Sequence, residues 1–431
     1  MIEAFDSSME LGAVVESRRE VPVIHRTDVL VVGGGPAGVG AALAAARHGA
    51  ATTIVEHYGF LGGMWTAGLL NPILDHQEKG GLVEELMQRL RTAGKLSSGA
   101  RASFDNEYLK YLLDQMMLES GVDMRLHRSA VGAVVDGDRV RGILTESKSG
   151  RQALLADVVI DCTGDGDIAA SAGVPFVKGR EEDGEMQSVT LFFMLAKVRY
   201  RQLRGGHDIY KLLEKAVRTH GLDYVIPYRT PSFFHLPLEN HSVVQIAHVH
   251  GVDGTNADDL SRAEIEARAQ IHQAVAVMQK VPEFAGVELV TSGPHIGVRE
   301  TRHIQGRARL EEADLLEGRA FDDGICWTRF SIDIHGAPVQ GTVAIEGRQV
   351  KPYQIPYRAL VPVNREGLLM AGRCISGSSR AHSSFRVTGD CVAMGQAAGT
   401  AAAIAISSGS LPSEVPADQL VARLKADGVT L

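Results

Sequence analysis

Three glycines near the start of the chain have the spacing of a phosphate-binding turn. Gly33, Gly35 and Gly38 follow the pattern G-x-G-x-x-G within "GGGPAG". The first allows a tight turn, the second lets the backbone approach a pyrophosphate, and the third lets a helix pack closely on a strand. Glu56 lies 23 residues after Gly33, where a carboxylate can accept hydrogen bonds from ribose hydroxyls. This combination predicts a dinucleotide site.

A strand, a helix and a second strand must position these residues. "DVLVV" (28–32) is an apolar run typical of a buried parallel strand, and "ATTIVE" (51–56) predicts a second one. Pro36 suits the first position of a helix that we expect to run to about His48. The positive end of that helix would face the phosphates.

The composition limits the class of protein. Of the 431 residues, 45% are hydrophobic and 22% charged, which is typical of a globular chain with two domains or one interleaved unit. The net charge of −8 argues against nucleic acid or an anionic membrane as the main partner. We see no secretion signal, and we expect no membrane insertion because the most apolar stretch (391–406) is too short to span a bilayer. The four cysteines lack C-x-x-C spacing, which disfavours a disulfide framework and predicts a cytoplasmic protein.

Further motifs extend over most of the chain. They are "FLGG" (60–63), "RETR" (299–302), "IPYRALVP" (355–362) and the series "AGRCIS", "AHSSFRV" and "GQAAG" within 371–399. With these motifs the chain resembles a broad family of FAD-dependent oxidoreductases in the glutathione-reductase-like superfamily, distantly related to fumarate reductase and succinate dehydrogenase flavoproteins. The motifs are specific for the family and not for a substrate. The resemblance implies an α/β fold, with a Rossmann-like FAD-binding domain joined to an α+β substrate or cap domain.

The resemblance also implies FAD as a non-covalent prosthetic group. There is no second strand–GxGxxG–helix unit for NAD(P)H, and His57 is farther from the glycine pair than the histidine of related covalent enzymes. The start of the C-terminal helix, around 388–390, would lie at the flavin pyrimidine ring. The residues expected to contact FAD are Gly33, Gly35, Pro36, Ala37, Gly38, Glu56, His57, Gly62, Gly63, Met64, Val131, Thr163, Gly164, Gly372, Arg373, Arg386 and Val387.

The expected FAD-binding domain is discontinuous and comprises residues 22–186 and 350–431. The substrate or cap domain is expected at 187–349, and residues 1–21 are expected to form an N-terminal arm. Apolar periodicity predicts helices within 80–94, 105–121 and 258–281. The last of these helices has one apolar stripe, formed by Ala267, Ile271, Ala274, Met278 and Val281.

The segment "HIGVRETRHIQG" (295–306) contains the first candidates for catalysis. Arg299 could hold a substrate carboxylate through two hydrogen bonds, and His303 could titrate near neutral pH. The alternative is a structural Arg–Glu network at a domain junction, which we favour for Glu300 and Arg302.

The segment "CWTRFSIDIHGAP" contains the second candidates. Read as one strand, it places Asp333 and His335 on a polar face that meets either solvent, the commoner case, or a wet cavity. In a cavity the two side chains could act as an acid–base pair. His248 and His250 lack a third ligand nearby in the sequence, so we predict no metal site.

The polar segment "SSRAHSSFRV", expected to be a loop, contains the third candidate. Counted back from "GQAAG", His382 falls where the fumarate-reductase branch has a substrate-contacting arginine. We therefore expect His382 to face both substrate and flavin, although the change from arginine argues against reduction of a dicarboxylate. The alternative is a histidine that is hydrogen-bonded inside the loop.

These observations predict an enzyme of the dehydrogenase or oxidase type. It would remove hydride from a small organic molecule at a C–H next to OH or NH, or at an activated C–C bond. The electrons would pass to O2, a quinone or another carrier. The alternative is a flavin-binding electron-transfer or scaffold subunit that is active only in a complex. The sequence leaves open whether the chain forms a homo-oligomer.

Overall fold

The computed structural model describes residue 16 and residues 19–98, 102–199 and 206–431. Its largest element is a seven-stranded sheet with the order β3-β2-β1-β6-β5-β4, in which β17 also pairs with β6. The strands of this sheet are β1 (Val23–Val32), β2 (Thr52–Val55), β3 (Asp123–Arg125), β4 (Ser129–Asp136), β5 (Arg139–Ser147), β6 (Gly150–Asp161) and β17 (Leu368–Met370). Most of the predicted N-terminal arm lies outside the described residues.

This sheet brings distant parts of the chain together. β1, β2, β3, β6 and β17 are parallel, and Val31 pairs with Ile54 on one side and Ile160 on the other. β17 belongs to the C-terminal part of the chain and pairs with the end of β6. β4 and β5 extend the sheet as antiparallel strands. The predicted α/β class with a parallel sheet is confirmed.

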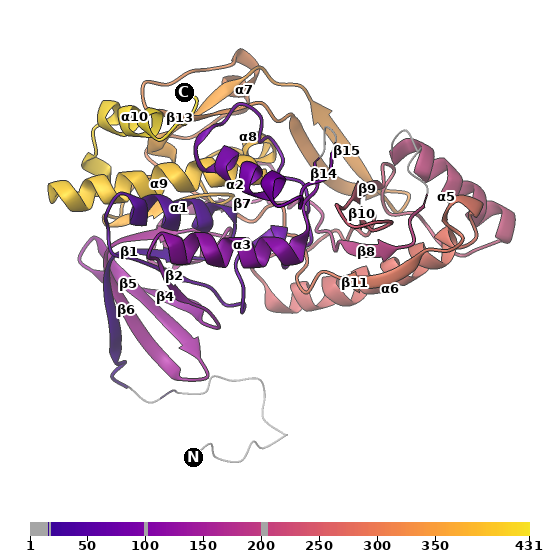
Figure 1. Cartoon of the computed structure of the whole chain (residues 1–431), viewed down its shortest axis with the longest axis horizontal. Helices are drawn as coiled ribbons and strands as arrows, with labels where there is room; N and C mark the ends of the chain where they lie inside the picture. Colours follow the sequence, from indigo (N-terminus) through magenta and orange to yellow (C-terminus); the bar gives the residue numbers. More distant parts are fainter. Residues whose placement is uncertain (1–15, 17–18, 99–101, 200–205) are drawn as a thin grey trace.

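Helices α1 (Pro36–Arg47) and α9 (Thr388–Ser408) pack on each other above the sheet (Figure 1). Their contact requires glycine. A Cβ atom on Gly395 would lie 2.0 Å from the carbonyl oxygen of Ala37, and one on Gly399 would lie 2.1 Å from that of Ala41. The small residues of α9 therefore let the two backbones approach closely, which holds the N-terminal turn of α1 against the C-terminal part of the chain.

Helix α9 corrects one expectation. Among the described residues it is the one helix long and apolar enough to cross a membrane by length and composition, so the prediction that this stretch is too short was wrong. The apolar stretch has 16 residues, whereas the helix that contains it has 21. However, 83% of its most apolar window is buried within the structure, as is usual for a core helix.

The remaining helices lie around this sheet or along the second sheet described below. They are α2 (Gly81–Thr92), α3 (Asn106–Glu119), α4 (Asp167–Ser171), α5 (Gly206–His220), α6 (Ala257–Met278), α7 (Glu312–Glu317), α8 (Ser379–Phe385) and α10 (Ala417–Ala426), with 3-10 turns η1 (Gly63–Trp65), η2 (Pro282–Phe284), η3 (Tyr357–Ala359) and η4 (Pro412–Glu414). The helices predicted within 80–94, 105–121 and 258–281 are α2, α3 and α6. Asp105 caps α3, because its carboxylate accepts hydrogen bonds from the N–H groups of Glu107 and Tyr108.

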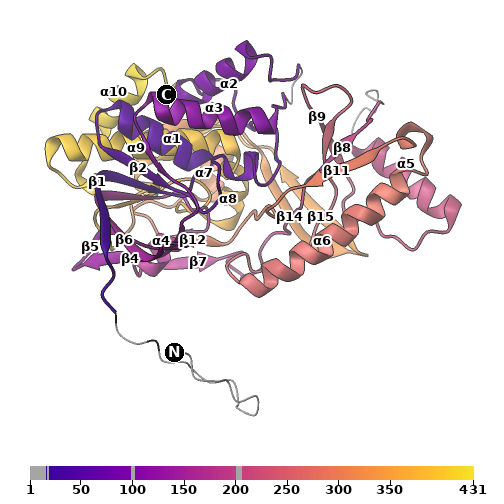
Figure 2. The same cartoon turned by 60° about the horizontal axis from the view of Figure 1, so that its bottom comes forward.

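A second antiparallel sheet has the order β11-β8-β10-β9. Its strands are β8 (Phe193–Ala196), β9 (Ser232–His235), β10 (Ser242–Gln245) and β11 (Glu288–Ser292). Helices α5 and α6 lie along this sheet at one end of the molecule (Figure 2). All five residues of the predicted apolar stripe are buried there, although Val281 lies beyond the end of α6. The predicted domain boundaries stay a proposal.

Three two-stranded ribbons complete the strand pairing of the described residues. They are β7 (Phe176–Lys178) with β12 (Arg302–Ile304), β13 (Gly324–Thr328) with β16 (Tyr353–Pro356), and β14 (Ile332–Val339) with β15 (Thr342–Arg348). The single strand expected around 326–335 was therefore wrong, because β13 and β14 pair in different ribbons. The polar loop expected at 378–387 was also wrong, because it contains helix α8.

Candidate functional site

A cavity of about 280 Å³ lies at the C-terminal ends of β1, β2 and β6. The glycine motif shapes it. Gly33 has φ +98°, and a Cβ atom there would lie 2.5 Å from the carbonyl oxygen of Cys162. A Cβ atom on Gly38 would lie 1.8 Å from the carbonyl oxygen of Gly33, whereas one on Gly35 would meet no atom within 4 Å. Gly35 thus borders open space at the start of α1, where the helix has no side-chain cap and its N–H groups can receive phosphate.

Glu56 stands at the end of β2 on the wall of this cavity. Its carboxylate accepts hydrogen bonds from the N–H groups of Gly34 (2.7 Å) and Tyr58 (2.9 Å), and it lies 2.7 Å from Nδ1 of His57. Burial would raise the pKa of Glu56, but the contacts with His57 and Tyr58 hold it below its ordinary value. The site therefore presents an ionised carboxylate, as recognition of ribose hydroxyls requires.

Arg373 stands where this cavity meets a second one. Its Nη1 donates to Oδ1 of Asp165 at 3.0 Å, and its guanidinium lies against Gly164, where a Cβ atom would be 2.5 Å from Nη2. Burial would lower the pKa of Arg373, but Asp165 keeps it above its ordinary value. A fixed positive charge therefore lies at the junction of the two cavities.

The structure places most of the predicted cofactor residues on the first cavity. Those that line it are Gly33, Gly35, Pro36, Ala37, Glu56, His57, Gly63, Met64, Thr163, Gly164, Gly372 and Arg373. Gly38 and Gly62 lie behind the wall, and Arg386 and Val387 line the second cavity instead. Val131 is 48% exposed and lines neither cavity, whereas Ser129 and Ala130 of the same strand line the first one, so its contact with FAD stays a prediction.

Sequence reasoning missed several residues of this wall. They are Tyr58, Arg128, Ser129, Ala130, Asp165 and His295. Tyr58 and Asp165 adjoin predicted positions and could have been found by extending those motifs. His295 comes from a distant segment and has no local signal. The glycines, the ionised carboxylate and the free helix terminus fit the pyrophosphate and ribose of a dinucleotide.

The second cavity has a volume of about 650 Å³ and shares Met64, Val298 and Arg373 with the first. It is lined on one side by apolar and aromatic side chains. These include Met64, Leu70, Leu74, Phe192, Phe234 and Phe330. Its polar lining contains Arg299, Asp333, His335 and Arg386. A small molecule with an apolar body and a charged end would match this wall.

Two arginines and one aspartate give the second cavity a positive charge. Arg299 is 7% exposed; its Nη1 donates to the carbonyl oxygen of Ser188 at 2.5 Å. Burial and the nearby Arg386 lower the pKa of Arg299 to about 9. Arg386 donates through Nη2 to the carbonyl oxygen of Asp333 (2.9 Å) and lies 3.5 Å from its Oδ2. Nε of Arg386 has no partner within the described part of the chain. Two guanidinium groups thus face one carboxylate.

His335, on the same wall, stacks with His248, which is buried and does not line the cavity. Nε2 of His335 lies 3.2 Å from Oδ2 of Asp333, and its Nδ1 lies 3.1 Å from Nε2 of His248. Nδ1 of His248 lies 3.1 Å from the carbonyl oxygen of Ile246. Burial and the positive charge of Arg299 lower the pKa of His335 to about 4. Burial would raise the pKa of Asp333, but His335 and the arginines hold it far below its ordinary range.

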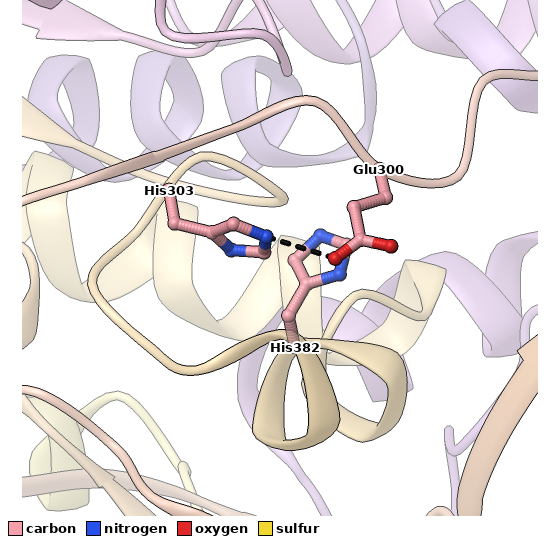
Figure 3. Close-up of side chains that lie close together, drawn as sticks. All are labelled: Glu300, His303 and His382. Carbon is pink, nitrogen blue, oxygen red and sulfur yellow. Dashed lines mark hydrogen bonds and ion pairs between the residues drawn. The ribbon is translucent and has the colours of Figure 1, made fainter. Parts of the chain in front are cut away.

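His303 and His382 occupy a different place from the one expected. Both are buried and line neither cavity. His303 lies 3.0 Å from Oε1 of Glu300, and the two imidazole rings meet edge to face, with centroids 4.6 Å apart (Figure 3). The expectation that His382 faces substrate and flavin does not match this placement, because α8 turns its side chain toward Glu300.

A buried ion pair holds the start of α9 against a loop on the floor of the second cavity. Lys79 pairs with Asp390 in the first turn of α9 and lies 2.9 Å from Oδ2 of Asp75. Its ammonium also donates to the carbonyl oxygen of Trp327 at 2.6 Å. The neighbouring Thr388 lines the cavity, so this pair sets the position of the helix terminus there.

Comparison with known proteins identifies the class of molecule. The model of a family described as FAD dependent oxidoreductase matches residues 28–424. Thiamine thiazole synthase from Aeropyrum pernix is 33% identical over 151 residues, which cover 32% of this chain and about half (55%) of that protein. Among solved structures, a triple mutant of the flavin-dependent brominase Bmp2 is 12% identical and has a TM-score of 0.50, with 93% of this chain and 84% of that chain covered. A geranylgeranyl bacteriochlorophyll reductase-like protein from Thermoplasma acidophilum is 15% identical and has a TM-score of 0.49, with 94% and 84% covered. At such low identity the likeness to the brominase shows the fold alone.

Proposed function

Because the chain belongs to the FAD dependent oxidoreductase family, we propose that it oxidises a small organic carboxylate at a C–H next to OH or NH. The observation that carries this proposal is the junction of the two cavities. The cavity with the dinucleotide-binding features opens beside Arg373 into a larger one with an apolar side and a charged side. Bound FAD supplies the hydride acceptor. The residues of the chain bind the substrate and receive one proton.

The positive charge of the second cavity supports an anionic substrate. Among the side chains that line the cavity, Asp333 is the one carboxylate that opposes Arg299 and Arg386, so the lining has an excess of positive charge, although Glu300 acts on Arg386 from outside the lining. A buried charge without a partner is costly, and a substrate carboxylate would remove that cost. Arg386 lines this cavity, so its guanidinium group is placed for such a contact.

The pair formed by His248 and His335 can bind one proton more than its two neutral rings carry. The contacts from Ile246 through His248 and His335 to Asp333 have an acceptor oxygen at each end. Three hydrogen bonds need three protons, whereas two neutral imidazoles supply only two. Nη2 of Arg299 points at Nε2 of His248 at 3.3 Å, which favours an unprotonated nitrogen there and directs the third proton to His335.

Asp333 is the member of this series that reaches the substrate. Its side chain is 32% exposed, whereas that of His335 is buried. We assign to Asp333 the contact with the substrate OH or NH, and to His335 the role of holding the proton that Asp333 passes on. A bound carboxylate would offset the charge of Arg299 and so raise the pKa of His335, which makes proton uptake depend on substrate.

The experiment uses the purified yellow protein without oxygen. Panels of 2-hydroxy and 2-amino carboxylates are added, each with a neutral control in which an alcohol or amide replaces the carboxylate, and loss of visible flavin absorbance is followed. We expect carboxylates to bleach the flavin and the matched neutral compounds to do so at least about tenfold more slowly. Reoxidation by O2 or by a quinone then distinguishes an oxidase from a dehydrogenase.

Equal rates for charged and neutral compounds would refute the anionic substrate. Bleaching by NADH or NADPH, with none of the carboxylates active, would instead favour reduction. A yellow protein that no compound bleaches until a partner protein is added would favour an electron-transfer subunit.

A further inference from the structure

A second group of polar side chains lies outside both cavities. Glu300, His303 and His382 each offer one atom that could bind a metal, and these atoms lie within 4.8 Å of one another. All three side chains are buried. Figure 3 shows both imidazole rings beside the Glu300 carboxylate. His303 belongs to β12 and His382 to α8, so only the folded chain brings the three residues together.

The hydrogen bonds of His382 leave one nitrogen ready to bind a cation. Its Nδ1 is buried and has no partner among the residues the structure describes. A hydrogen bond to the backbone carbonyl of Arg373 then comes from Nε2, which carries the proton. Metal-bound histidines have this same arrangement, with the second ring nitrogen donating to a carbonyl or carboxylate. His382 is 1% exposed, so this nitrogen lies in the protein interior, away from bulk solvent.

The contact between His303 and Glu300 has the separation of two neighbouring ligands. Their Nε2 and Oε1 atoms are 3.0 Å apart. Two ligands bound at about 2.0–2.1 Å with tetrahedral angles lie about 3.3 Å apart, so an ion fits where the shared proton now lies after a small opening. Ser379 donates to the same carboxylate oxygen at 2.5 Å and would keep it oriented.

A path from solvent leads to this group. A third cavity of about 290 Å³ has Glu300 and Ser379 on its wall. The charged residues that line it are Glu182, Asp183, Glu185, Glu300, Glu346, Arg180 and Arg380. Five carboxylates against two guanidinium groups attract a cation and offset the positive charge of the nearby Arg373 and Arg386.

We propose that Glu300, His303 and His382 bind one divalent transition-metal ion. Zinc matches a set of two imidazoles and one carboxylate, with the fourth position open to a water from the third cavity. The three residues line neither the cofactor cavity nor the substrate cavity. The sequence prediction of no metal considered only His248 and His250, because nothing in the spacing of the three new residues indicates that they meet.

The test measures zinc in the FAD-containing protein after incubation with ZnCl2 and desalting. Wild type, Glu300→Gln and His382→Gln are compared, with His241→Gln in a partly exposed loop as the control. We expect about one zinc per chain in wild type and in the control, and loss of about tenfold or more of the bound zinc in the two variants. The ratio of FAD to protein shows that each variant is folded.

Failure of the wild type to retain zinc, manganese or iron would overturn the proposal. Retention by both variants at the level of the control would do the same. If the two variants do not fold, X-ray absorption of zinc-loaded wild type decides: a shell of nitrogen and oxygen with two imidazoles supports the site, and any other shell refutes it.

Discussion

Replacement of Lys79 by methionine tests how the structure fixes the floor of the substrate cavity. The ammonium of Lys79 and the carboxylate of Asp390 are both buried, at 1% and 0% side-chain exposure. Burial would lower the pKa of Lys79, but the Asp390 carboxylate raises it above its ordinary value. Methionine has a similar length and no charge, so Lys79→Met removes the cation and leaves Asp390 in the protein interior.

The magnitude follows from the burial of the carboxylate that remains. Breaking a buried pair by removing one partner costs about 3–5 kcal/mol, because the remaining charge has lost both water and its counter-ion. Asp390→Asn in the Lys79→Met background removes that charge, and we expect it to restore about 2 kcal/mol or more. Burial already raises the pKa of Asp390 well above its ordinary value. The carboxyl of the single variant can therefore bind a proton, and its loss of stability should be smaller at about pH 5.5 than at about pH 8.

Urea unfolding, followed by tryptophan fluorescence and by release of FAD, measures these differences. Lys197→Met is the control, because Lys197 also pairs with a carboxylate, Glu288, but both side chains are more than half exposed, at 53% and 58%. This control should lower the free energy of unfolding by less than about 0.5 kcal/mol. A decrease in the free energy of unfolding of less than about 1 kcal/mol for Lys79→Met would refute this explanation, and so would a double variant that is no more stable than Lys79→Met. Either result would mean that the unpaired buried carboxylate is not the main cause of the lost stability.

Three further predictions concern the two cavities. Gly35→Ala should leave the unfolding of the FAD-free protein unchanged, because its Cβ meets no protein atom, but should weaken FAD binding by about tenfold or more in a fluorescence titration; unchanged affinity would contradict the cofactor position. Arg299→Met should weaken binding of a carboxylate substrate by about 10- to 100-fold in a spectral titration, with FAD content unchanged, and equal loss for a neutral analogue would argue against a charge contact. The free energy of unfolding should fall as pH falls from 6.5 toward 4, because the pKa of His335 is lowered in the folded protein and the unfolded chain therefore binds the proton first. Wild type should thus lose up to about 3 kcal/mol relative to His335→Gln across that range in urea unfolding, and parallel pH curves would contradict it.

The local motifs were interpreted correctly because each depends on backbone geometry within a short segment. The turn at Gly33 needs a positive φ, and the sequence marks that need with glycine. Helix α3 has its cap at Asp105, and the apolar stripe of α6 shows in its periodicity. Those signals come from residues that are neighbours along the chain.

Errors arose where pairing between distant segments decided the outcome. The segment from Cys326 to His335 alternates like one strand, yet its halves pair with different partners and form β13 and β14. His382 has the right distance from "GQAAG" for a substrate contact, but α8 turns it toward Glu300. Alternation and spacing describe one chain segment and contain no information about which partner it meets.

The sequence by itself determined the dinucleotide turn, the acidic end of the second strand and the family, because these depend on residue types at fixed short spacings. Only the tertiary structure decided which charged side chains share a cavity. Arg299, Asp333 and His335 face one another there, while His303 and His382 meet elsewhere. The physical reason is that the strength of a charge or hydrogen bond depends on distance and burial, and both are set by the packing of segments far apart in the chain.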